Sequence, residues 1–154
     1  MSAPTPHRPS FISSLVYRDN RAALKWLQSA FGFEVSEVLT DANDNIVHAE
    51  MSHGDGIVMI GNEFTVWAKS PASVGGTNTQ RVHVQIERGI DAHCEHARKA
   101  GATIAMEPAD QFYGARSYMA VDLDGHHWTF AQSIKHVSTE EMEQASGFQF
   151  KKST

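Results

Sequence analysis

The feature that most constrains the fold is a set of landmarks that recur at one spacing. Gly32 and Gly101 each stand where a helical pattern stops. The two Asp-Gly pairs that precede a final strand end at Gly56 and Gly125, and their separation (125 − 56) equals that of the first two glycines (101 − 32). We call this shared separation the repeat interval. Sequence identity between the halves is low, so one interval shared by independent features indicates a repeated supersecondary unit.

The first half predicts one helix set among four strands. Asp19 or Asn20 is a good N-cap, and apolar residues then recur at helical spacing until Gly32, a residue type common where a helix ends in a left-handed turn. The helical stripe consists of Ala23, Leu24, Leu27, Ala30 and Phe31. Short apolar runs separated by Asp, Asn and Gly predict strands over 11–17, 33–39, 46–52 and 56–60.

The second half repeats this order. Strands are predicted over 81–86, 102–105, 117–122 and 126–131, and a helix is predicted between Arg88 and Gly101. Arg88 follows Asp19 by the repeat interval (88 − 19), so the helix starts agree with the other landmarks. Cys94 falls on the apolar stripe of this helix, and Trp128 is expected beneath it. Both are therefore predicted to be core residues.

These patterns predict an α+β fold made of two tandem βαβββ modules. The chain of 154 residues has the size of one domain. We expect a single domain over 1–154, with its parts at about 10–67 (module one), 68–79 (linker), 80–132 (module two) and 133–154 (tail). Ser138 and Glu141 have the spacing of a capping box, which predicts a short helix near 139–145.

Composition excludes several classes of partner. The net charge of −5 and the pI near 5.9 argue against nucleic acid and anionic membranes, which bind mainly through Lys and Arg. The sequence lacks an apolar run of about 20 residues, the length that crosses a bilayer. The single cysteine excludes an internal disulfide, and no export signal is visible at the start. We therefore expect a cytoplasmic protein.

Three segments resemble one known family. The opening strand, helix and turn of the family resemble residues 16–35, VYRDNRAALKWLQSAFGFEV. Its second helix and turn resemble residues 96–104, HARKAGATI. Its closing loop and last strand resemble residues 110–130, DQFYGARSYMAVDLDGHHWTF. On these motifs the chain resembles the vicinal-oxygen-chelate superfamily, which includes glyoxalases, bleomycin-resistance proteins and extradiol dioxygenases. The resemblance implies curled mixed sheets around a cleft, a small-molecule ligand and a homodimer. Modules of this family pair within one chain or across a dimer, and the loop lengths here are compatible with both.

The resemblance also gives positions for a metal centre, on the first and last strand of each module. These positions correspond to Ile12 and Ile60 in module one, and to Arg81 and Thr129 in module two. Isoleucine has no donor atom, and a guanidinium stays protonated and repels a cation. We therefore expect that the metal centre of the family is absent and that the protein carries no cofactor.

The same mapping predicts which side chains line the cleft. One wall is apolar and the other polar, which is the usual composition of a small-molecule site. The predicted ligand-binding residues of the sheets are Ser14, Val58, Ile60, Arg81, His83, Gln85, His127 and Thr129. The resemblance adds the loop 110–116, in which Tyr113 would stack on a ligand and Arg116 would pair with an anionic group. A structural hairpin with Arg116 paired to Asp110 is the alternative.

Two functions remain open at the level of sequence. The first is metal-independent binding of a small organic molecule. The second is an enzyme, either a lyase, isomerase or dioxygenase-like protein with a relocated metal or a metal-free catalyst. The candidate catalytic residues are His83, His127 and Glu50, because imidazoles and a carboxylate can transfer protons or hold an ion. A metal assay separates the metal-dependent form, since that chemistry uses the ion as a Lewis acid.

Overall fold

A computed structural model describes residues 2–151 and confirms an α+β fold with two tandem modules. The chain divides into two compact units. Unit one comprises the chain up to Asn78 together with Leu123–Gly125, and unit two comprises Thr79–Asp122 and the chain from His126 onward. A short turn from the second half is therefore part of the first unit. In residues 2–151 no helix has the length and hydropathy that would let it cross a membrane.

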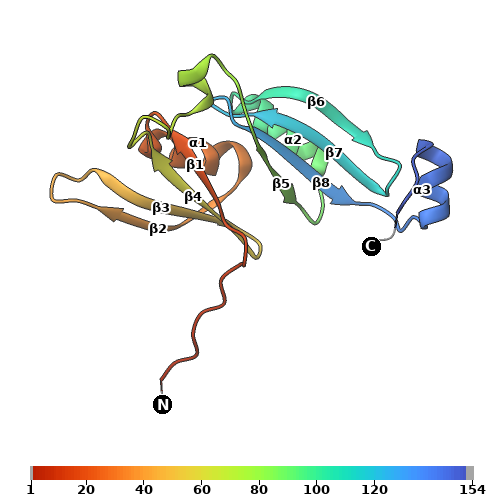
Figure 1. Ribbon diagram of the computed structural model, residues 1–154, viewed down its shortest axis with the longest axis horizontal. Coiled ribbons are helices and arrows are strands. Elements are labelled where there is room, and N and C mark those ends of the chain that lie inside the picture. The colour runs from red at the N-terminus through yellow and green to blue at the C-terminus, as the bar shows by residue number, and fades with distance from the viewer. Residues whose placement is uncertain (1, 152–154) are drawn as a thin grey trace. The chain divides into compact units, whose positions relative to one another are not determined.

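Unit one contains a four-stranded mixed sheet covered on one face by a helix (Figure 1). The strand order is β1-β4-β3-β2, in which β1 and β4 are parallel and the other pairs are antiparallel. Its elements are β1 (Ser13–Tyr17), α1 (Asn20–Phe31), β2 (Glu34–Thr40), β3 (Ile46–His53), β4 (Gly56–Asn62) and the 3₁₀ helix η1 (Pro71–Val74).

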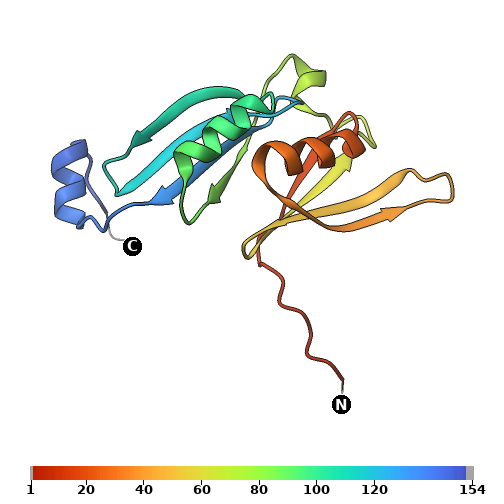
Figure 2. The same ribbon diagram turned by 180° about the vertical axis from the view of Figure 1, so that it is seen from behind.

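Unit two has the same topology, with the strand order β5-β8-β7-β6 and one parallel pair, β5 with β8. Figure 2 shows α2 lying across one face of this sheet. Its elements are β5 (Arg81–Gln85), α2 (Ile90–Lys99), β6 (Thr103–Asp110), β7 (Ala115–Val121), β8 (His127–Ser133) and α3 (Thr139–Ser146). The capping box of α3 is confirmed, because Ser138 accepts a hydrogen bond from the Glu141 amide and Glu141 accepts one from the Ser138 amide.

The helices begin and end for local chemical reasons. Asp19 caps α1 by accepting a hydrogen bond from the Ala22 amide, and Gly32 ends it at a φ of 75°. The second helix departs from the repeat interval, which placed its start at Arg88. α2 instead follows Gly89, whose φ of 75° turns the chain one residue later. Glycine has no side chain to cap the helix, and the Ile90 amide donates to Oε1 of Gln132.

The core of each unit lies between its helix and its sheet. In unit one, Leu27 and Tyr17 are fully buried at this interface. In unit two, the predictions for Cys94 and Trp128 are confirmed, since neither side chain is exposed. The indole N–H of Trp128 donates to the buried carboxylate of Asp122. Within residues 2–151 the other face of each sheet carries no helix, and we call it the open face.

The tail packs on a hairpin of its own unit. The carbonyl of Gly114, in the β6–β7 turn, accepts hydrogen bonds from the amides of Ile134 and Lys135. Gly114 has a φ of 89°, and a Cβ there would overlap the Lys135 carbonyl and approach Val137. The ring of Phe112 in this turn contacts that of Phe148, with centroids 6.2 Å apart. Figure 1 shows α3 beside this end of the sheet.

Candidate functional site

Each open face carries a row of four residues in register across all four strands. In unit one Ser14 pairs with Met59, Met59 with Glu50, and Glu50 with Glu37. In unit two His83 pairs with Thr129, Thr129 with Met119, and Met119 with Met106. Residues opposite one another in a sheet share a face, so each set forms a continuous strip of side chains. We call these strips the unit-one row and the unit-two row.

A bulge at the same place in both units sets the last member of each row. The register shifts between Val35 and Glu37 in β2, and between Ile104 and Met106 in β6. Glu37 and Met106 are separated by the repeat interval (106 − 37), so the two bulges are equivalent. A bulge inserts one residue and thereby changes the face on which the next side chain lies. It brings Glu37 and Met106 onto the open faces.

The unit-two row changes from polar to apolar across the sheet. Nε2 of His83 lies 3.4 Å from the side-chain oxygen of Gln85, and the side-chain amide of Gln85 donates to the hydroxyl of Ser133. Met119 and Met106 supply thioether surface on the next two strands. The hydroxyl oxygen of Thr129, between these halves, is buried and has no hydrogen-bond partner within residues 2–151. An unsatisfied hydroxyl in such a place is uncommon and can accept or donate to a ligand.

Five of the predicted ligand-binding residues lie together on this open face. Along β5 the exposed side chains of Arg81, His83 and Gln85 alternate with the half-buried side chains of Val82 and Val84. The register places Arg81 beside His127, and His83 beside Thr129. The residues that come together are Arg81, His83, Gln85, His127 and Thr129.

The structure corrects the prediction that Val58 and Ile60 form an apolar wall of the cleft. Ile60 pairs with Leu15, and both are buried beneath α1. Val58 lies on that same face, whereas Ser14 lies on the open face beside Met59. Subtracting the repeat interval from a position in the last strand of unit two gives a residue one position too late in β4. The cause is the tight hairpin that joins β3 to β4, in which His53 pairs with Gly56.

The corresponding turn of unit two is longer, which explains the difference. Val121 pairs with His127 across the connection 122–126. Gly125 lies within that connection at a φ of 90°, whereas Gly56 is already paired in its strand. The two Asp-Gly pairs therefore match in sequence but not in structure. Met59, rather than Ile60, is the equivalent of Thr129.

The closing loop carries the two remaining predicted residues. Arg116 forms ion pairs with Asp110 and Asp91, with nitrogen–oxygen distances of 3.1 and 2.9 Å, so the hairpin contact predicted as the alternative is present. Hydrogen bonds to these two carboxylates raise the pKa of Arg116. Arg116 lies two residues from the buried Tyr118 and therefore on the α2 face of β7. Tyr113 is about half exposed and contacts Phe112.

Glu50 occupies an environment that sequence reasoning missed. Its buried carboxylate is held by Arg8, with an oxygen–nitrogen distance of 2.8 Å, and lies 3.2 Å from Nε2 of His48. The hydrogen bond from Arg8 outweighs the effect of burial and lowers the pKa of Glu50. A carboxylate held in this way is a weaker general base than a free one. The alternation of His48 and Glu50 in β3 could have indicated that these two side chains share a face. The contact with Arg8 could not be recognised in this way, because Arg8 is 42 residues from Glu50 in the sequence.

The residues at the family's metal positions do not suit a metal ion. With the corrected register they are Ile12, Met59, Arg81 and Thr129. This set combines a hydrocarbon, a thioether, a permanent cation and one hydroxyl. A catalytic divalent ion uses imidazole and carboxylate donors. These four side chains therefore do not form a site for a catalytic divalent ion.

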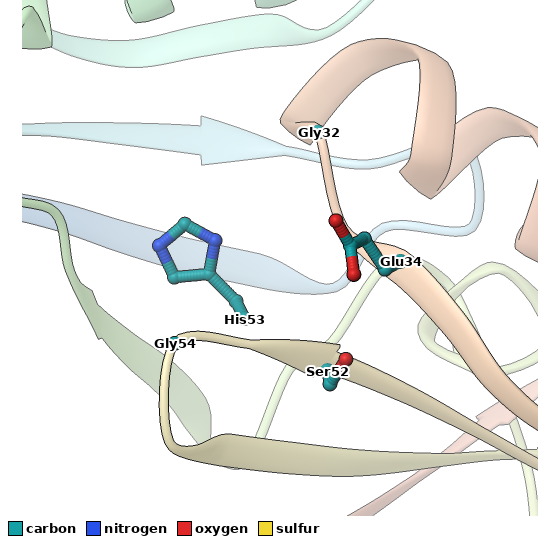
Figure 3. Close-up of a pocket in the computed structure, with 5 residues that line it drawn as sticks. All are labelled: Gly32, Glu34, Ser52, His53 and Gly54. Atoms are coloured by element: carbon teal, nitrogen blue, oxygen red, sulfur yellow. The ribbon is translucent and has the colours of Figure 1, made fainter.

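A small pocket of unit one lies at the turn after β3 (Figure 3). It has a volume of about 130 Å³ and is lined by Gly32, Glu34, Ser52, His53 and Gly54. Typical small-molecule pockets have roughly 300–1,000 Å³. The ring of His53 also packs edge-on against the buried Phe33. We interpret this pocket as a surface hollow of the hairpin.

The match to a family model shows which superfamily the chain belongs to. The model of the glyoxalase/bleomycin resistance protein/dioxygenase superfamily matches residues 11–130. The chain belongs to this superfamily. Uncharacterized protein Mb0911c of Mycobacterium bovis is 26% identical over 145 residues, which cover 92% of this chain and 94% of that protein. Uncharacterized protein Rv0887c of Mycobacterium tuberculosis is 26% identical over the same length, with 92% and 84% covered.

Solved structures are also similar to the chain. TioX from Micromonospora sp. ML1 has a TM-score of 0.66 and 31% identity, with 84% of this chain and 100% of TioX covered. TnmS3 from Streptomyces sp. CB03234, described as an antibiotic binding protein, has a TM-score of 0.62 and 16% identity, with 86% and 99% covered. At that identity, the likeness to TnmS3 concerns the fold.

Proposed function

We propose that this superfamily member binds a small, partly apolar organic molecule on the open face of unit two, without the metal centre of the family. The observation that carries the proposal is the unit-two row. It brings together, on neighbouring strands of one sheet, an imidazole, a hydroxyl that has no partner within residues 2–151, and two thioethers. Apolar area with a few placed polar groups is what recognition of a small molecule requires.

The neighbouring residues extend this surface. Arg81, Gln85 and His127 surround the polar end and offer donors to carbonyl, hydroxyl or acidic groups of a ligand. Methionine side chains adapt to ligands of irregular shape and favour contacts with aromatic rings. Tyr113 of the closing loop completes the proposed set by stacking on an aromatic part of the ligand. The antibiotic binding described for TnmS3 supports an antibiotic as the class of ligand.

Methionine methyl signals test the location of binding. The chain has six methionines, and Met106 and Met119 belong to the unit-two row, whereas Met51 is buried under α1 and Met142 lies in α3. Titration of ¹³C-methyl-methionine protein with a panel of aromatic antibiotics should shift Met106 and Met119 and leave Met51 and Met142 unchanged. Saturable binding that shifts Met142 alone would place the site elsewhere.

Two substitutions test the polar contacts. Thr129→Val removes the hydroxyl and keeps the shape, and His83→Ala removes the imidazole. Each should weaken binding by about tenfold, the equivalent of one well-placed hydrogen bond of about 1.4 kcal/mol. His96→Ala, at an exposed position on α2, is the matched control and should leave the dissociation constant unchanged. Equal affinities in all three variants would refute the proposal.

The enzyme hypothesis differs in what happens to the ligand. His83 and His127 share the open face, so proton transfer by these imidazoles is the form that the geometry allows. A ligand recovered chemically unchanged after prolonged incubation supports binding alone. The family resemblance also supports a homodimer as the assembly.

A further inference from the structure

The arm that precedes β1 places a cation on the unit-one row. Both terminal nitrogens of Arg8 bond the carboxylate of Glu50, at 2.8 and 3.3 Å. The side chain of Glu50 is only 5% exposed, whereas that of Arg8 is 49% exposed. Glu37 also acts on Arg8, because its charge adds to that of Glu50 in raising the pKa of the guanidinium. A positive charge is therefore held against the buried carboxylate of Glu50 on this face.

The same residues form a set of metal donors. Glu37, His48 and Glu50 each offer one ligand atom, and these atoms all lie within 4.8 Å of one another. Zinc binds nitrogen and oxygen donors at about 2.0–2.2 Å, so neighbouring donors in such a site are about 3.0–3.5 Å apart. Nε2 of His48 and Oε1 of Glu50 are already 3.2 Å apart. Glu37 is exposed, and its ligand atom lies within 4.8 Å of the other two.

The backbone fixes this arrangement. His48 and Glu50 alternate along β3 and therefore share the open face. Glu37 pairs directly with Glu50, and it does so because the bulge after Val35 shifts the register of β2. Without that inserted residue, Glu37 would lie on the face covered by α1. Bulges that redirect a side chain in this way are common beside functional sites.

We propose that Glu37, His48 and Glu50 form a site for a divalent transition-metal ion such as Zn²⁺, and that Arg8 is a tethered competitor for it. One imidazole and two carboxylates suit zinc and neutralise its charge. A guanidinium and a metal ion repel one another, so the two occupants exclude each other. The three residues lie on β2 and β3, whereas the family's metal positions in this unit lie at the first and last strands, β1 and β4. The proposed site is therefore distinct from the family's metal positions. It is also independent of the ligand site proposed for unit two.

Zinc binding to the full-length, untagged protein tests this site by titration calorimetry. We expect one ion per chain. Arg8→Ala should bind Zn²⁺ about three- to tenfold more tightly, because the competing ion pair is lost. Glu37→Gln and Glu50→Gln should each bind at least about tenfold more weakly, because a ligand is lost. Glu37 is exposed, so its substitution tests the site even if the buried Glu50→Gln variant folds poorly.

His96→Ala is the matched control, since His96 is an exposed histidine of the other unit, and it should bind zinc as the wild type does. Release of the arm gives a second readout. Amide relaxation of residues 2–10 should show faster motion in the zinc complex than in the free protein. Unchanged zinc affinity in Glu37→Gln would overturn the site. Equal affinity of Arg8→Ala and the wild type would overturn the competition.

Discussion

Asp55 and Asp124 share a sequence motif but have opposite environments. Asp55 is exposed in the hairpin between β3 and β4. Asp124 is buried, and its carboxylate accepts hydrogen bonds from the backbone amide of Arg18 and from two guanidinium nitrogens of the same residue, at 2.7 to 3.1 Å. This contact attaches the turn 123–125 to unit one, so we expect the two aspartates to differ in their effect on stability.

Substitution by asparagine measures that difference. Asp124→Asn removes the charge from a buried, hydrogen-bonded carboxylate and should cost about 1.5–3 kcal/mol. Asp55→Asn is the matched control and should change stability by less than about 0.5 kcal/mol, as exposed substitutions usually do. Hydrogen exchange of the α1 amides reports the stability of unit one. Similar losses in both variants would contradict the assigned role of Asp124.

The same carboxylate predicts a dependence of stability on pH. Burial raises the pKa of Asp124, but hydrogen bonds and the charge of Arg18 outweigh that effect and leave the pKa below its usual value. A group with a lowered folded pKa contributes stability that is full above the unfolded pKa of about 3.9 and is lost as the pH falls through the folded value. Unfolding by urea at pH 7 and pH 3 should therefore show a larger loss in the wild type than in Asp124→Asn.

At the scale of elements, the sequence predicted the helices and the order of the strands well. Asp19, Gly32 and the capping box of α3 act through local hydrogen bonds and backbone angles, so nearby residues suffice to recognise them. The register of β4 could not be predicted in this way. Its residues Ile57, Val58, Met59 and Ile60 are apolar on both faces, so alternation does not indicate which side chains face α1.

The candidate site shows the same division. For unit two, the family resemblance gave the positions of Arg81 and Thr129, and alternation along each strand added His83 and His127 to the same face, as the register has them. The contact between Arg8 and Glu50 was missed, because it joins an arm without secondary structure to a strand 42 residues away. No local pattern encodes a contact of that separation.

The β6–β7 turn gives a prediction about the tail. An alanine at Gly114 requires an unfavourable positive φ and overlaps the Lys135 carbonyl. Gly147→Ala is the matched control, with a φ of 74° and open space around the added Cβ. The positive φ costs about 1–2 kcal/mol in each variant, and the overlap should add about 1–3 kcal/mol at Gly114 alone. Thermal unfolding should show the larger loss for Gly114→Ala, and equal losses would argue against close packing of the tail.

At the scale of the whole molecule, the proposed homodimer has a direct test. Light scattering of the full chain should give twice the mass of 17.0 kDa. If the tail contributes to the dimer, truncation after Gln132 should lower the measured mass by more than the deleted residues account for. A full-length protein with the mass of one chain would refute the dimer, and a truncated dimer would limit the tail to its contact with the β6–β7 turn.

The two rows show how far one plan has diverged within the molecule. Equivalent positions carry Ser14 and His83, Met59 and Thr129, Glu50 and Met119, and Glu37 and Met106. The two units share their strand topology and the bulge in β2 and β6, whereas the side chains of the two rows differ in chemistry. One unit presents carboxylates suited to a cation, and the other presents surface suited to an organic molecule.

The tight hairpin before β4 has a consequence for how such proteins evolve. Because β4 is apolar on both faces, one codon inserted into the turn could slide the strand by one residue without burying a charge. Ile57, Met59 and Gly61 would then exchange faces with Val58, Ile60 and Asn62. A lineage could in this way acquire a new recognition surface in a single event, while every amino acid of the strand stayed the same.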